Sequence, residues 1–360
     1  MFISIQLLRV IACSLVLFSH IDPYLVSSLN RKFSGGGIGV DIFFIISGFV
    51  MAAATSKTDM GIHSALSFFI KRIIRIWPMY AIITVVFAYE MNYLKFEYID
   101  LPYIIDSLLM LPVSIHNSMY GDIFIDPKLG VGWTLQFEMF FYFVISILII
   151  LKIRKPYIPA LIFAVPILFN LRPVALSPFF SMVSCPILFE FAFGYWIYSV
   201  YCKYPSAFQL AAPMLIPTGS ALIVIAMTGD WSQWYHNTPR MIVRFGDVNL
   251  HRAIAWGVPS AILFCGVLGC EEWIKKSGVI SRISVMIGDA TYSLYLTHIL
   301  VFQWMLRHIP TYPTSSIFIY IVTPFIVALI VHFLIEKPIT KILNDIASKK
   351  IRLPLKSKIA

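Results

Sequence analysis

The sequence predicts an all-α membrane protein, a polytopic bundle of about ten transmembrane helices, from its composition and from the length and spacing of its apolar blocks. Of its 360 residues, 59% are hydrophobic and only 13% are charged, and the mean hydropathy is +0.82. Soluble domains carry about 25% charged residues, so a soluble fold could not cover this much apolar surface. Short joints rich in Lys, Arg, Pro and Gly separate the blocks, as in helical membrane proteins.

The apolar blocks give the expected spans directly. They cover residues 3–22, 38–55, 74–90, 134–151, 157–171, 179–200, 209–228, 253–270, 284–307 and 316–335. The first block lacks a basic n-region and a small-residue cleavage site, so we expect a retained helix rather than a signal peptide. A further apolar stretch, 101–113, is too short for a span and contains Asp106, which is typical of a re-entrant or interfacial segment.

The basic residues predict the orientation. With the N-terminus in the cytoplasm, roughly two-thirds of the 28 Lys and Arg residues fall on the inner side, as the positive-inside rule requires. If 101–113 crossed the bilayer, the basic cluster 152–155 and the basic tail would lie outside. We therefore expect both termini in the cytoplasm, with a membrane domain over 1–340 and a short basic tail over 341–360.

Other function classes lack support in the sequence. The net charge of +10 is explained by inner loops and a tail beside anionic lipid, and no nucleic-acid motif accompanies it. The five cysteines are scattered without metal-type spacing, so no metal site is expected. There is no internal repeat and no low-complexity segment.

Charged residues inside spans are costly and are therefore candidates for function. Arg9 and His20 lie on the first span, where eleven steps of about 100° place them near one helix face, roughly 16 Å apart along the axis. That face offers a cation near the cytoplasm and an imidazole near the exterior, where it can act as a general base. The alternative is that Arg9 reaches the inner headgroups and His20 sits in the outer interface.

Two carboxylates are expected near His20. Asp41 enters the second span from outside at a similar depth, where it can orient the imidazole as the third member of a triad does. Glu138 comes down from the outer face on a later span, so the three groups are expected to converge in the outer third of the bilayer. The glycines around Asp41 also permit close helix approach, which is an alternative reason for their presence.

Three cations stand at the inner entrance of the third span. Lys71, Arg72 and Arg75 suit an anionic ligand that carries phosphates. The alternative is ordinary positive-inside flanking.

Taken together, these residues resemble the integral-membrane acyltransferase family 3, many of whose bacterial members O-acetylate surface polysaccharides. The matching segments are the Arg9 and His20 pair, 39–49 (GVDIFFIISGF), 72–78 (RIIRIWP), 133–142 (WTLQFEMFFY), 288–298 (GDATYSLYLTH) and 336–338 (EKP). Two features depart from the family. The proline that often follows the Phe-Tyr pair is absent, since residues 143–146 read FVIS, and we expect no appended hydrolase-like periplasmic domain.

The resemblance implies an acyl-coenzyme A donor, acetyl-CoA in the first instance, bound from the cytoplasm, with no permanently bound cofactor. It implies that Arg9 and His20 are essential and that Arg72 and Arg75 lie near the donor. We assign His20, Asp41, Glu138 and Arg9 to catalysis. The donor site is assigned Arg9, Lys71, Arg72, Arg75, Ser47 and Gly48, and the acceptor site Trp133, Tyr295 and His298.

The expected activity is transfer of an acetyl group to a hydroxyl of a surface polysaccharide, or of its lipid-linked precursor, at the outer face of the bacterial cytoplasmic membrane. His20 either activates the hydroxyl as a base or first takes the acetyl group covalently. His298 either pairs with His20 or Glu138, or is simply packed in the bundle. The outer loop 229–252 either holds the acceptor or belongs to an aromatic belt.

Two alternatives remain open at this point. Another donor, such as succinyl-CoA, would serve the same chemistry. A transporter or flippase would also bury charges in a helical bundle.

Overall fold

The computed structural model describes residues 2–21, 34–91, 101–117, 121–125, 127–170, 178–228, 250, 252–308 and 317–352. The α-helices are α1 (Ile3–His20), α3 (Ile38–Thr55), α4 (Ile62–Glu90), α5 (Leu101–Leu108), α6 (Trp133–Ile150), α7 (Ile158–Asn170), α8 (Pro178–Val183), α9 (Leu188–Lys203), α10 (Pro205–Thr228), α13 (Val258–Gly269), α14 (Glu271–Lys276), α15 (Gly278–His308), α16 (Ile317–Val331) and α17 (Lys337–Arg352). Shorter turns of 3-10 helix are η1 (Ser34–Gly37) and η2 (Gly130–Gly132), and π-helical turns are η3 (Ala253–Gly257) and η5 (His332–Glu336).

Seven of the described helical segments are long and apolar enough to cross a membrane, which confirms a multi-pass helical membrane protein. They are Ile3–His20, Ile38–Thr55, Ile62–Glu90, Gly130–Ile150, Pro205–Thr228, Gly278–His308 and Phe318–Lys349. The apolar helix Ala253–Gly269 is shorter. The expected spans at 157–171 and 179–200 overlap α7 and α9, which have 13 and 16 residues. The count of ten crossings stays a prediction.

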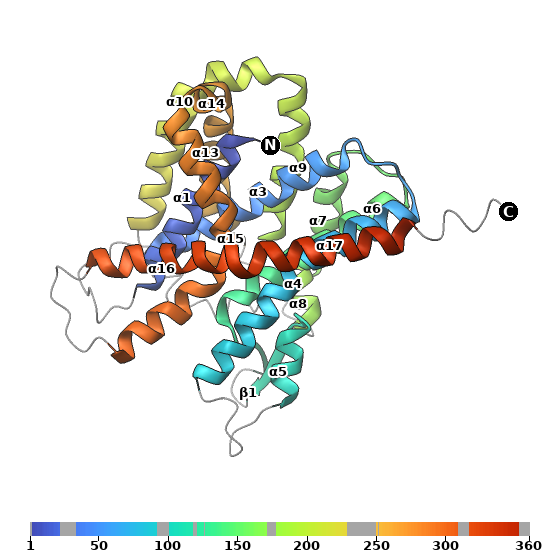
Figure 1. The fold of residues 1–360 in the computed structure, drawn as a ribbon. Helices are drawn as coiled ribbons and strands as arrows, with labels where there is room; N and C mark the ends of the chain where they lie inside the picture. Colours follow the sequence, from blue (N-terminus) through green and yellow to red (C-terminus); the bar gives the residue numbers. More distant parts are fainter. Residues whose placement is uncertain are drawn as a thin grey trace.

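The segment 101–113 forms α5 and then enters a hairpin that the sequence analysis did not predict. At about 1.5 Å per residue, the 8 residues of α5 are too short to cross a bilayer. Strand β1 (Val113–Asn117) pairs antiparallel with β2 (Gly121–Ile125), with Val113 opposite Ile125. Figure 1 shows α5 and β1 together at one end of the molecule beside α4.

Helix α1 lies at the centre of the arrangement that positions the site. It packs on α3 and on α15, α3 in turn packs on α9, and α4 packs on α6. Figure 1 shows α16 and α17 running as one long rod across these helices, and η5 joins the two.

Small residues bring three of these helices into close contact. A Cβ atom at Gly48 would lie 2.0 Å from the carbonyl oxygen of Phe191 on α9, and one at Gly39 would lie 2.2 Å from the carbonyl oxygen of Ala12 on α1. Both glycines are therefore needed for backbone approach, the use that small residues commonly serve in membrane bundles.

The N-terminus of α1 is held by a carboxylate from a distant part of the chain. The backbone N–H groups of Ile3 and Ser4 donate to Glu271 on α14 at 3.0 and 2.8 Å. Burial raises the pKa of Glu271, but the hydrogen bonds from Ser4, Ile3 and Lys275 outweigh it, so the pKa lies below the ordinary value. The negative charge also complements the positive end of the α1 dipole.

Candidate active site

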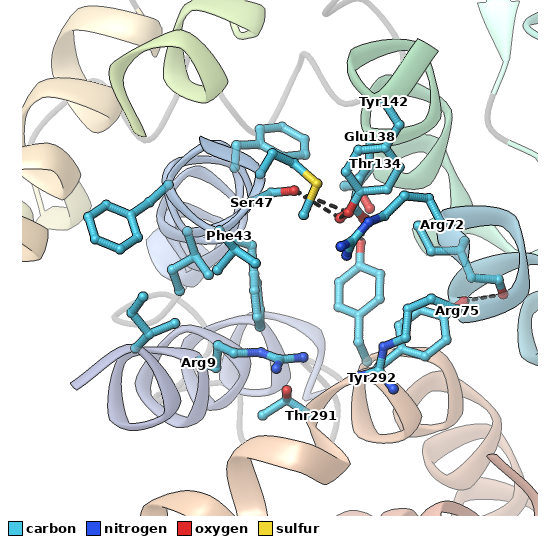
Figure 2. Close-up of a pocket in the computed structure, with 18 of the residues that line it drawn as sticks. Arg9, Phe43, Ser47, Arg72, Arg75, Thr134, Glu138, Tyr142, Thr291 and Tyr292 are labelled. Carbon is cyan, nitrogen blue, oxygen red and sulfur yellow. Dashed lines mark hydrogen bonds between the residues drawn. The ribbon is translucent and has the colours of Figure 1, made fainter. Parts of the chain in front are cut away.

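A cavity of about 530 Å³ lies between α1, α3, α4, α6 and α15. Figure 2 shows Arg9 from α1 and Arg72 from α4 reaching toward the same space. Arg75, one turn after Arg72, also lines the cavity, and apolar side chains such as Phe43 and Val50 line much of the remainder. The structure thus brings together three of the predicted cations in one hollow.

A carboxylate with two hydroxyl partners faces these cations. Glu138 accepts hydrogen bonds from Tyr142 and, at 3.0 Å, from Ser47 on α3 (Figure 2). The guanidinium of Arg72 lies 5.7 Å from the centre of the Tyr142 ring and 5.4 Å from that of Phe68. Its buried Nε has no hydrogen-bond partner among the described residues. Ser47, which the sequence analysis assigned to the donor site, thus lines the cavity, and Arg72 presents an unmatched donor there.

Arg75 is paired with a buried acid, Glu336, which the sequence analysis included in a matched segment but gave no role. Its Nη1 lies 2.6 Å from Oε1 of Glu336, whose side chain is fully buried. Glu336 also accepts from Ser293 at 2.6 Å and bonds His332 at 2.8 Å. A carboxylate buried in an apolar segment requires a cationic partner. The position of Glu336 in an apolar segment was therefore the feature of the sequence that could have predicted such a partner.

Arg9 is oriented through a neighbour on its own helix. Its Nη1 donates to Gln6 Oε1 at 3.3 Å, and Gln6 Nε2 donates to Asp289 of α15 at 2.7 Å. Gln6 was also missed by the sequence analysis. Gln6 could have been identified from its spacing, because a polar side chain three residues before Arg9 lies on the same helix face.

The other end of α1 carries a pair of imidazoles. The rings of His20 and His298 meet edge to face with centres 5.1 Å apart. His20 does not line the cavity, but Tyr295 does, and its ring centre lies 6.0 Å from that of His298. The Tyr295 hydroxyl is fixed by the carbonyl of Val131 at 2.9 Å and by Thr134 at 2.7 Å. Tyr295 therefore lies between the cavity and the imidazole pair.

Asp41 does not orient His20, which corrects the expected triad. Its carboxylate is fully buried and bonds Arg252, with Oδ2 to Nη2 at 2.8 Å and Oδ1 to Nε at 3.2 Å. The Arg252 guanidinium also lies 5.6 Å from the ring centre of Trp133. The physical reason is that a two-bond Arg–carboxylate pair satisfies this buried charge better than an imidazole could.

The expected convergence of three groups in one place is consequently wrong. Glu138 belongs to the cavity, Asp41 to the pair with Arg252, and His20 to the pair with His298. Trp133, assigned to the acceptor, lies beside Arg252 and outside the cavity lining.

Two donor-site assignments are not supported. Lys71 is exposed and does not line the cavity. Gly48 is at the contact with α9, where its missing side chain serves packing.

Among the described residues, the structure shows neither a candidate metal site nor a disulfide. No group of three or more His, Cys, Asp and Glu side chains there could hold a metal ion. All five cysteines are free thiols, and Cys13 and Cys185 are buried.

Comparison of the sequence with known proteins shows the family of this chain. A family model described as an acyltransferase domain matches residues 2–333. The exopolysaccharide production protein ExoZ of Rhizobium meliloti (strain 1021) is 28% identical over 277 residues, which cover 75% of this chain and 77% of that protein. Nodulation protein 10 of Rhizobium leguminosarum bv. viciae is 24% identical over 336 residues, or 84% of this chain and 83% of that protein.

No solved structure matches the chain. The family model covers nearly the whole of the described bundle, including the cavity and both imidazoles. The chain therefore belongs to the membrane proteins of acyltransferase family 3.

Proposed function

We propose that this protein is an acyl-coenzyme A-dependent O-acyltransferase. It moves an acetyl group from acetyl-CoA in the cytoplasm to a hydroxyl of a surface polysaccharide, or of its lipid-linked precursor, at the outer face. One observation carries the proposal: a cationic cavity and an imidazole pair lie at opposite ends of α1, and α15 contributes to both.

The cavity suits the donor. Coenzyme A carries phosphates at one end and a thioester at the end of a long, flexible arm. Arg72 and Arg75 offer cations to the phosphates, with the unmatched Nε of Arg72 as a free donor. Arg9, held by Gln6, lies deeper along α1 and lines the path of the arm. The apolar walls suit the uncharged part of the arm.

The imidazole pair suits the transfer. His20 lies roughly 16 Å beyond Arg9 along α1, so the thioester must pass Tyr295 to reach it. His20 is exposed at its end of the helix, where an acceptor can approach. An imidazole in contact with both substrates can take a proton or the acyl group itself.

The proposed topology places the arginine-bearing end on the cytoplasmic side. α7, α9 and the η3–α13 helix add three crossings to the seven long apolar segments, which gives ten. Both termini are then in the cytoplasm of a bacterial cell, and most Lys and Arg residues lie on that side.

The acceptor class follows from the relatives. One of them is an exopolysaccharide production protein, which supports a polysaccharide or its precursor as acceptor here. Succinyl-CoA is the second donor to test, because the arginines that line the cavity would also accept its carboxylate.

Two measurements test the proposal. Purified protein is given radiolabelled acetyl-CoA or succinyl-CoA, and release of the coenzyme A thiol is followed; we expect release with acetyl-CoA. Polysaccharide from a deletion strain is then compared with wild type by proton NMR, where we expect loss of acetyl methyl signals. Sugar flux across vesicles without thioester loss would instead identify a transporter.

A further inference from the structure

We infer that His298 is a second catalytic residue, the base that takes the proton of the acceptor hydroxyl while His20 carries the acyl group. This inference rests on the proposed function, because it divides the proposed transfer between two named imidazoles.

Backbone contacts fix the hydrogen on each ring. His20 Nδ1 lies 2.8 Å from the carbonyl oxygen of Val16, and His298 Nδ1 lies 3.1 Å from that of Leu294. A carbonyl oxygen only accepts, so Nδ1 carries the hydrogen in both rings. Each neutral ring therefore presents a lone pair on Nε2.

The two rings differ in what surrounds them. His298 is 1% exposed, and its buried Nε2 has no hydrogen-bond partner among the residues that the structure describes. Buried polar atoms are nearly always hydrogen bonded, so an exception calls for a specific explanation. A hydroxyl donor placed beside His20 would supply the missing bond, because the two ring centres are only 5.1 Å apart.

Exposure decides which ring is the nucleophile. A nucleophile must approach a carbonyl carbon directly, and His20 is the exposed ring. His298 is enclosed by the rings of His20, Tyr295 and Phe302. A base needs only to accept a proton through a hydrogen bond, which a buried lone pair can do.

The first step forms the acylated enzyme. Nε2 of His20 attacks the thioester carbonyl carbon, the C–S bond breaks, and the electron pair leaves with the thiolate of coenzyme A. His20 is then an acyl-imidazolium, because Nδ1 keeps its hydrogen and still donates it to the carbonyl oxygen of Val16. Neither of its nitrogens can now accept a proton, so the next step requires a different base.

The second step uses that base. The acceptor hydroxyl oxygen attacks the acyl carbon, its proton passes to Nε2 of His298, and the C–N bond breaks with return of the electron pair to His20. The proton then leaves His298 for water, and an equivalent proton joins the thiolate. An ester and a thiol have replaced a thioester and an alcohol.

The test separates the two steps in purified full-length protein. Protein in excess over radiolabelled acetyl-CoA is quenched rapidly and denatured at neutral pH, and label on His20 is measured. Transfer is measured separately to polysaccharide purified from the deletion strain. We expect His298→Gln to acquire label like wild type but to transfer it at least about 100-fold more slowly, the lower end of a general-base contribution. His20→Gln should lose both steps.

His308 provides the matched control. It lies on the same helix, and its Nδ1 bonds the carbonyl of Trp304 one turn earlier at 2.8 Å, but it is exposed and away from His20. His308→Gln should keep both steps at wild-type rates.

Three results would overturn the inference. They are wild-type transfer by His298→Gln, absence of label on wild-type protein that does transfer, and loss of labelling in both His298→Gln and His298→Asn when each purifies as a monodisperse protein. A wild-type protein that cleaves neither acetyl-CoA nor succinyl-CoA would instead remove the proposed function, so the two failures are distinguishable.

Discussion

The polar groups at the two ends of α1 are satisfied to different degrees, although one donor, Nε of Arg72, is also unmatched at the cavity. Around the cavity, Arg9 is bonded to Gln6, Arg75 to Glu336, and Glu138 to two hydroxyls. At the other end, each imidazole bonds its own helix through Nδ1, and Nε2 of His298 has no partner among the described residues. A set of groups that mostly satisfy one another suits binding in a fixed geometry, whereas an unmatched lone pair suits chemistry.

A substitution of His20 is the most direct test of this difference between the two ends of α1. His20→Gln keeps polarity and approximate size but can neither take a proton nor carry an acyl group. We expect acetylation to fall by about 100-fold to 10,000-fold, with normal amounts of protein in the membrane. Substantial acetylation by this variant, measured by polysaccharide NMR, would return His20 to an interfacial role.

A large effect of a different kind is expected at Asp41. Removing one partner of a buried ion pair leaves the other charge uncompensated, at a cost of about 3–5 kcal/mol. Asp41→Asn should therefore lower thermal stability in detergent, and Arg252→Gln should do the same. Because the residues are coupled, the double variant should lose less than the sum of both. Full stability of Asp41→Asn would show that this pair is not a structural one.

Substitutions of the cavity residues Arg72 and Arg75 should differ in their effects on donor affinity and on thermal stability. We expect Arg72→Ala to weaken donor binding by about 10-fold to 100-fold, because a hydrogen bond to a charged group is worth roughly 1.5–3 kcal/mol. Arg75→Ala should weaken binding and also lower thermal stability, because it leaves Glu336 buried without its cation. The exposed neighbour Lys71 is the control, and Lys71→Ala should change neither quantity. Equal stability of Arg72→Ala and Arg75→Ala would argue against this distinction.

Gln6 should have a smaller influence, on donor binding alone. Gln6→Met removes the bridge from Asp289 to Arg9, so Arg9 should spend less time directed into the cavity. A rise of a few-fold in the KM for acetyl-CoA with little change in kcat is the expected result. A fall in kcat at unchanged KM would place Gln6 in the transfer step instead.

The smallest effect is expected outside the cavity, at Glu271. Glu271→Gln should cost about 1 kcal/mol, since it weakens two hydrogen bonds to the start of α1. Because the folded pKa of Glu271 is lowered, its charge stabilises fully above about pH 4.3, and this contribution is lost as the pH falls through the folded pKa. Thermal unfolding between pH 3.5 and 7 checks the sign, with the exposed neighbour Glu272→Gln as control.

Sequence reasoning found the helices and the polar residues within them, but not their partners. Hydrophobic block length depends on the bilayer, so α1, α3 and α6 could be anticipated closely. The partner of Asp41 could not, because Arg252 is 211 residues away in the sequence and only packing brings η3, which it precedes, to α3. Similarly, the sequence indicated that Glu138 lies within a span but predicted His20 as its neighbour instead of Ser47 and Tyr142. The rotation of a helix about its own axis is set by tertiary contacts, which the sequence does not show.

The position of Tyr295 bears on how well the membrane retains its proton gradient. A route by which an acyl group crosses the bilayer is also a route for protons, and any continuous file of water along it would dissipate the membrane potential. The Tyr295 ring lines the cavity and also contacts the ring of His298; its hydroxyl is held by Val131 and Thr134, and its ring centre lies 6.3 Å from that of Phe43. If the proposed function holds, we expect vesicles that contain Tyr295→Ala to leak protons when no donor is present, whereas vesicles that contain the wild-type protein should hold the gradient.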